Sequence, residues 1–174
     1  MGYFLKAYNL AKEAFKDKVD KGGHPYFDHL IRVCDRISTE KKLKCTIFDT
    51  TLNLWYEKAE IVAILHDYIE DTEATLDDLR QEGFDDEIVN AIDAISRKDK
   101  ELYMEFIDRV SDNALARLVK KYDLEDNMNI LRLKEITDKD LQRIKKYWYA
   151  WKYLNGEISY MVAHNIIHPN NKVR

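Results

Sequence analysis

Apolar residues recur three and four positions apart along most of the chain, which is the spacing of helices that bury one face. Seven such stripes predict helices within residues 4–15, 27–37, 52–65, 88–95, 102–110, 115–122 and 141–154. Thr75, followed by Asp78, begins a further short helix that Gly83 can close. Hardly any segment alternates with period two, and the loops are short, so neighbouring helices should pack back on each other. The pattern predicts an all-α fold.

The length and composition favour a single domain. The chain has 174 residues, of which 45% are hydrophobic and 34% charged, as expected of one globular domain with a substantial core. We expect this helical bundle to occupy residues 1–160 and a C-terminal tail to occupy residues 161–174, as a short helix followed by a loose end.

Several classes of protein are disfavoured by the sequence. No apolar run approaches the length of about 20 residues that a membrane helix needs, and the first residues lack the apolar centre of a secretory signal. We therefore expect a cytoplasmic protein without a membrane partner. The net charge of −4 and the absence of a basic stripe argue against a nucleic-acid partner. The two cysteines are too few for a disulfide framework, and Cys34 lies on an apolar stripe, which predicts a core position.

The segment AILHDYIEDT carries the chemistry. His66 and Asp67 end a strongly apolar helix, and Glu70 and Asp71 follow four positions after each of them, so each pair is expected to share a helix edge. Ionisable groups crowded in this way favour a cation among them. Mixed imidazole and carboxylate ligands suit Mn²⁺, Fe²⁺ or Zn²⁺.

Two further ligands are expected from other segments. His29 follows the turn KGGHPY at the start of an apolar helix, and Asp123, in LVKKYDLEDNM, adjoins the predicted buried positions Val119 and Tyr122. Each feature alone has a structural explanation: an HD dipeptide is usually a surface accident, and Asp71 before a threonine can simply end a helix. Together they predict a metal site of the form H…HD…D.

From about Leu10 to Trp151 the sequence resembles the HD hydrolases of the RelA/SpoT family and their stand-alone small alarmone hydrolases. KGGHPYFDHLIRV is similar to the family's G-x-P-Y-I-x-H-P segment, and ILHDYIEDT to its L-L-H-D-x-x-E-D-T. AISRKDKELYMEFIDRV resembles the helix pair that follows, and VKKYDLEDNM stands where the family has V-K-L-A-D-R-L-H-N-M.

This resemblance implies a hydrolase that removes the 3′-pyrophosphate of the alarmone (p)ppGpp and releases GDP or GTP. It implies one Mn²⁺ bound by four residues, His29, His66, Asp67 and Asp123. Glu70 and Asp71 are the implied catalytic pair, which would orient and deprotonate the attacking water. The implied substrate contacts are Lys21, Tyr26, Asn127, Arg143 and Tyr147.

The sequence departs from the family at three places. Asp20 stands where an arginine that helps to hold the guanine nucleotide is expected, Leu30 replaces a proline, and Glu125 and Asp126 replace a basic or histidine pair. Two alternatives therefore stay open: an HD phosphatase or nucleotidase acting on another phosphorylated nucleotide, and a nucleotide-binding regulatory module without turnover. The aromatic residues near residue 150 suit a homo-oligomer contact as well as a core.

Overall fold

The predicted apolar stripes all lie on helices of the computed structural model, which describes residues 2–171. The helices are α1 (Tyr3–Ala14), α2 (Tyr26–Lys44), α3 (Thr50–Leu65), α4 (Tyr68–Asp71), α5 (Leu76–Gln81), α6 (Asp86–Ile95), α7 (Tyr103–Ser111), α8 (Ala114–Asn127), the 3₁₀ turn η1 (Ile130–Arg132), α9 (Asp138–Leu154) and α10 (Tyr160–Ile167). Within residues 2–171 no β-strand forms, and Val19 and Pro25 make only an isolated bridge. The all-α prediction is confirmed.

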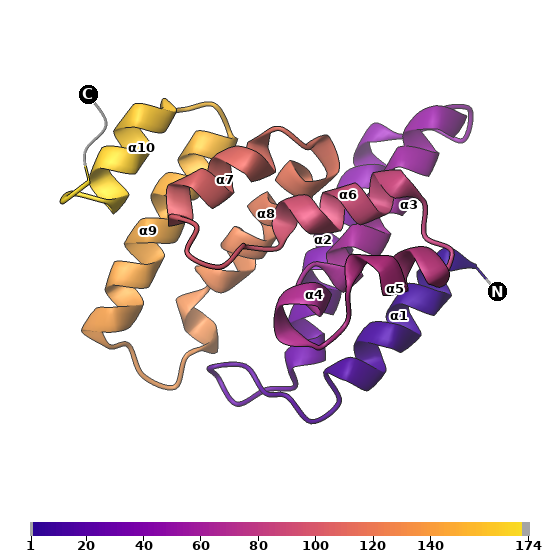
Figure 1. Cartoon of the computed structure of the whole chain (residues 1–174), viewed down its shortest axis with the longest axis horizontal. Coiled ribbons are helices and arrows are strands. Elements are labelled where there is room, and N and C mark those ends of the chain that lie inside the picture. Colours follow the sequence, from indigo (N-terminus) through magenta and orange to yellow (C-terminus); the bar gives the residue numbers. More distant parts are fainter. Residues whose placement is uncertain (1, 172–174) are drawn as a thin grey trace.

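Helix α3 is the centre of the bundle. It packs against α1, α2, α6 and α8, and all five residues of its last stretch, 61–65, are buried. Figure 1 shows α9 and α10 at one end of the long axis, α1, α2 and α3 toward the other, and α8 between them. The residue that follows α3, His66, is therefore delivered into the interior of the molecule, where α2 and α8 also pass.

The short helix predicted after Thr75 forms as α5. The Thr75 side chain accepts a hydrogen bond from the backbone N–H of Asp78, and the Asp78 carboxylate accepts one from the N–H of Thr75 at 2.7 Å. This reciprocal cap satisfies two of the donors that a helix start leaves unpaired. Gly83 follows with a φ of +89°, the left-handed conformation that glycine adopts without strain. Residues 72–83 thus lead the chain from α4 through α5 toward α6.

The C-terminal helices are less deeply packed than the rest. On α9 only Ala150 and Leu154 are buried, and Leu141 and Trp148 of its predicted apolar stripe are exposed. The segment that the sequence sets apart as a tail begins within α10, which contacts α7 and α9. The end of that predicted tail, residues 172–174, lies outside the described residues. In residues 2–171 no helix has the length and apolar character to cross a bilayer.

The two free cysteines differ in environment, which allows a test of the packing. Cys34 lies in the core and is 5% exposed, whereas Cys45, at the end of α2, is half-buried. Burial raises the pKa of the Cys34 thiol to about 12, and thiolate is the form that reacts. We expect iodoacetamide at pH 8 to modify Cys45 in the native protein and Cys34 only after denaturation in urea, as followed by peptide mass spectrometry. Equal rates at the two cysteines in the native protein would contradict this packing.

Candidate metal centre

The HD dipeptide lies at a break between two helices. Helix α3 ends at Leu65, Asp67 adopts φ −101° and ψ 1°, and α4 begins at Tyr68. His66 and Asp67 thus follow the last residue of α3, whereas Glu70 and Asp71 lie on α4, whose first turn closes where the N–H of Asp71 donates to the carbonyl oxygen of Asp67 at 3.0 Å. His66 contributes to the break, because its Nδ1 lies 2.7 Å from the carbonyl oxygen of Ala63, one of the last carbonyls of α3 that no helical N–H satisfies.

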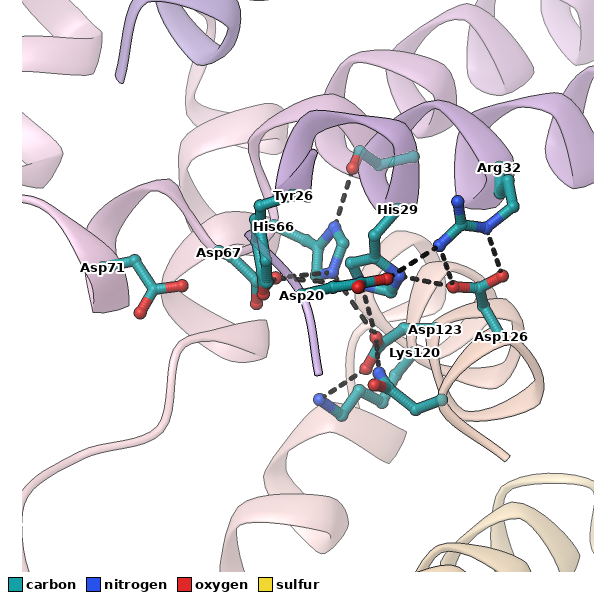
Figure 2. A network of polar contacts seen from close by, with 12 residues as sticks. Asp20, Tyr26, His29, Arg32, His66, Asp67, Asp71, Lys120, Asp123 and Asp126 are labelled. Carbon is teal, nitrogen blue, oxygen red and sulfur yellow. Dashed lines mark hydrogen bonds and ion pairs between the residues drawn. The ribbon is translucent and has the colours of Figure 1, made fainter. Parts of the chain in front are cut away.

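The four predicted ligands converge at this break. Ligand atoms of His29, His66 and Asp123 all lie within 4.8 Å of one another, and all three residues are buried. Oδ1 of Asp123 is 3.2 Å from Nε2 of His29 and 3.5 Å from Nε2 of His66. Oδ2 of Asp67 lies 3.2 Å from Nε2 of His66 and 3.9 Å from Nε2 of His29. Figure 2 shows these side chains from α2, the α3–α4 junction and α8 pointing toward one another.

The donor atoms of this cluster fit a divalent cation. A carbonyl oxygen only accepts, so Nδ1 of His66 carries the proton and Nε2 of the neutral ring presents a lone pair. That buried Nε2 has no hydrogen-bond partner, and its neighbours are carboxylate oxygens, which are also acceptors. A lone pair and two carboxylates that face one another in the interior require a proton or a metal ion between them.

The charges of the cluster also favour a bound cation. Burial lowers the pKa of His66, but the carboxylates of Asp67 and Asp123 raise it well above its ordinary value. Burial raises the pKa of Asp123, but the charge of the Lys120 ammonium and the adjacent imidazoles of His29 and His66 hold it well below the ordinary range. Burial likewise raises the pKa of Asp67, but the charge of His66 lowers it below the ordinary value, so both carboxylates are ionised at neutral pH and attract a cation as they attract a proton.

Three side chains hold the two carboxylates in place. The Tyr26 hydroxyl donates to Oδ2 of Asp67 at 2.5 Å, and the Asn127 amide donates to Oδ1 of Asp123 at 2.5 Å. Nζ of Lys120 lies 2.9 Å from Oδ2 of Asp123. Tyr26 and Asn127, predicted as substrate contacts, thus bind candidate ligands directly. The sequence analysis missed Lys120, although its place one helical turn before Asp123 was a usable signal.

Glu70 and Asp71, the predicted catalytic pair, point in different directions. Oε1 of Glu70 accepts a hydrogen bond from the backbone N–H of Arg97 at 2.5 Å, and the side chain lines a hollow beside Asp67 and Asp123. Burial raises the pKa of Glu70, and the N–H of Arg97 only partly offsets that rise. Asp71 instead forms an ion pair with Lys18 at 2.5 Å and lies apart from the cluster (Figure 2). Glu70 and Asp71 are adjacent on α4, where successive side chains point about 100° apart, so only Glu70 lines the hollow.

Two hollows meet at the candidate metal centre, and Tyr26, Asn127 and Tyr147 line both of them. The hollow on the Glu70 side has a volume of about 240 Å³, and its cationic side chains are Arg97, Lys120 and Lys146. The hollow on the opposite side has a volume of about 220 Å³, and its cationic side chains are Lys21, Arg132 and Arg143. Of these six cations the sequence analysis assigned Lys21 and Arg143 to the site.

Asp20, which departs from the family pattern, has a structural role. Its Oδ1 accepts hydrogen bonds from the backbone N–H groups of Gly22 at 2.8 Å and His24 at 3.0 Å. Burial raises the pKa of Asp20, but these two hydrogen bonds and the charge of Arg132 lower it below the ordinary value. A Cβ at Gly22 would lie 2.3 Å from the Arg132 carbonyl oxygen, so the turn packs directly against η1. Asp20 therefore fixes one wall of the hollow that Lys21 and Arg132 line.

No model of a known protein family matches this sequence. The site nevertheless combines features that suit hydrolysis of a phosphate ester: a group able to hold a cation, a carboxylate of raised pKa beside it, and cationic side chains on both sides. These features, together with the quoted motifs, support the proposal that follows.

Proposed function

We propose that this protein is a metal-dependent phosphohydrolase that acts as a 3′-pyrophosphohydrolase on guanosine 3′,5′-bis(diphosphate). The observation that carries the metal requirement is the buried Nε2 of His66, which has no hydrogen-bond partner and faces the carboxylates of Asp67 and Asp123. Similarity of the segments around His29, His66 and Asp123 to the RelA/SpoT hydrolases supports the choice of substrate. Mn²⁺ is the ion that this similarity suggests.

The residues around the centre suit a water attack on phosphorus. A divalent ion held by His29, His66, Asp67 and Asp123 would lower the pKa of a water molecule and offset charge on phosphoryl oxygens. Glu70 faces the same hollow and accepts the proton of the attacking water. The bond between phosphorus and the ribose 3′ oxygen breaks, so that ppGpp and water give GDP and pyrophosphate.

The cationic side chains suggest how the substrate lies. Arg97, Lys120 and Lys146 line the hollow on the Glu70 side, where they can bind oxygens of the departing pyrophosphate. Lys21 and Arg143 line the opposite hollow together with Tyr147 and can bind the 5′ phosphates. A molecule with phosphate groups at both ends of a ribose matches two cationic hollows on either side of one metal centre.

A second candidate keeps the metal and changes the nucleotide. The position of the arginine expected to hold guanine is taken by Asp20, whose carboxylate binds the turn backbone. Base recognition must then come from other residues of that hollow, and a nucleotide with a different base or a 2′- or 3′-phosphorylated cofactor becomes a candidate substrate.

A substrate panel separates the candidates. Purified protein with Mn²⁺ should release pyrophosphate and GDP from ppGpp, and the chelator EDTA should stop the reaction. The parallel substrates are 3′-AMP, 2′-AMP, NADP⁺ and GTP, with phosphate and pyrophosphate measured separately. Release from another nucleotide and not from ppGpp would transfer the proposal to the second candidate. Binding of Mn²⁺ and ppGpp without any release would identify a regulatory module and overturn the enzymatic proposal.

A further inference from the structure

We propose that Asp126 is a positioning residue of the metal centre, which holds His29 so that Nε2 points at the ion. The inference rests on the metal site of the proposed function but not on the identity of the substrate. It concerns a residue at which the chain departs from the family pattern, and which the sequence analysis left without a role.

The contact between the two residues fixes the form of the imidazole. Oδ2 of Asp126 lies 2.7 Å from Nδ1 of His29, and an ionised carboxylate only accepts hydrogen bonds. Nδ1 of His29 therefore carries the proton, and Nε2, 3.2 Å from Asp123, presents its lone pair to the centre. An outer carboxylate of this kind orients a ligating histidine and raises its basicity.

Asp126 is itself held rigidly. Arg32 binds it with two hydrogen bonds, from Nε to Oδ1 at 2.8 Å and from Nη2 to Oδ2 at 3.1 Å, and Arg132 binds Oδ2 from η1. Arg32 lies three residues after His29 on α2, so one helix face presents both side chains to the same carboxylate. A two-pronged arginine contact restricts rotation of the carboxylate, and the restricted carboxylate in turn restricts the imidazole ring.

The second histidine provides an internal contrast. His66 donates its Nδ1 proton to a neutral backbone carbonyl, that of Ala63, whereas His29 donates to a charged group on another helix. The carbonyl cannot be removed by a side-chain substitution, but the carboxylate can. The orientation of His29 is therefore the part of the centre that a single conservative change can loosen without touching a ligand.

The test measures metal affinity of the free protein. Titration calorimetry with Mn²⁺ alone should give a dissociation constant about 10-fold or more weaker for Asp126→Asn than for the unaltered chain, since outer partners of ligands contribute about 10–100-fold. Glu125→Gln is the matched control, because Glu125 is the adjacent acid on α8 and binds Trp151 rather than a candidate ligand. The control should bind Mn²⁺ within twofold of the unaltered chain, and both variants should keep the melting temperature of the metal-free protein.

Two outcomes would overturn the inference. One is a Mn²⁺ affinity of Asp126→Asn within threefold of the unaltered chain; the other is an equal loss in Glu125→Gln. If Asp126→Asn does not fold, Arg32→Gln decides, because it loosens the two-pronged contact and leaves Asp126 in place; it should weaken Mn²⁺ binding at least threefold, and unchanged affinity would overturn the inference. An unaltered chain that binds no Mn²⁺ would instead refute the proposed metal site.

Discussion

Replacing His66 by alanine is expected to abolish Mn²⁺ binding and hydrolysis together. The substitution removes the one buried nitrogen that has no hydrogen-bond partner in the cluster and faces Asp67 and Asp123. A metal ion contributes several kcal/mol of transition-state stabilisation, and each 1.4 kcal/mol is about tenfold in rate, so we expect a loss of at least about 10³-fold in kcat/KM. Calorimetry with Mn²⁺ and a pyrophosphate-release assay measure the two effects.

His164 offers the matched control for this experiment. It is also a buried histidine with an unpartnered Nδ1, but it lies on α10 against the ring of His168 and not in the metal cluster. His164→Ala creates a comparable cavity and a comparable loss of melting temperature, and it should retain Mn²⁺ binding and most of the activity. Full activity in His66→Ala, or equal losses in the two variants, would exclude the proposed centre.

The helices could be predicted because their signals are local. The spacing of apolar residues within one segment decides which face is buried, and the start of α5 follows from Thr75 and Asp78 alone. The stripes fail at the ends and edges of the bundle, where four large apolar residues of predicted stripes are exposed: Phe4, Leu52, Leu141 and Trp148. A stripe indicates which face turns inward but not how much of the bundle covers it.

The residues of the candidate site could be predicted from the sequence, but the directions in which their side chains point could not. His29, His66 and Asp123 were identified by chemistry and motif, although 94 residues separate the first from the last. Which of the adjacent acids Glu70 and Asp71 lines the hollow depends on the direction in which the chain leaves the break at Asp67, and the spacing of apolar residues does not reveal that direction. The partner of Asp126 is equally inaccessible from sequence, because His29 lies 97 residues away and the contact depends on how α2 and α8 pack.

Because Glu70 lines the hollow and Asp71 does not, we expect substitutions of these two neighbouring acids to have different effects on kcat. Glu70→Gln removes a proton acceptor from the hollow beside the metal centre without removing a candidate ligand. General acid–base groups contribute about 10²–10⁴-fold, so kcat should fall within that range while Mn²⁺ affinity stays unchanged. Asp71→Asn breaks only the ion pair with Lys18 and should keep kcat within about threefold of the unaltered chain, as expected for a partly exposed pair.

The pH dependence of kcat gives this comparison a second measurement. Glu70 accepts a proton only when it is ionised, and burial raises its pKa, so kcat should rise with pH through that raised pKa and then level off. The acidic limb should persist in Asp71→Asn and be absent from the residual activity of Glu70→Gln. If instead Asp71→Asn loses as much rate as Glu70→Gln, both acids act in the reaction, and the position of Asp71 in this structure is not the one that it occupies during turnover.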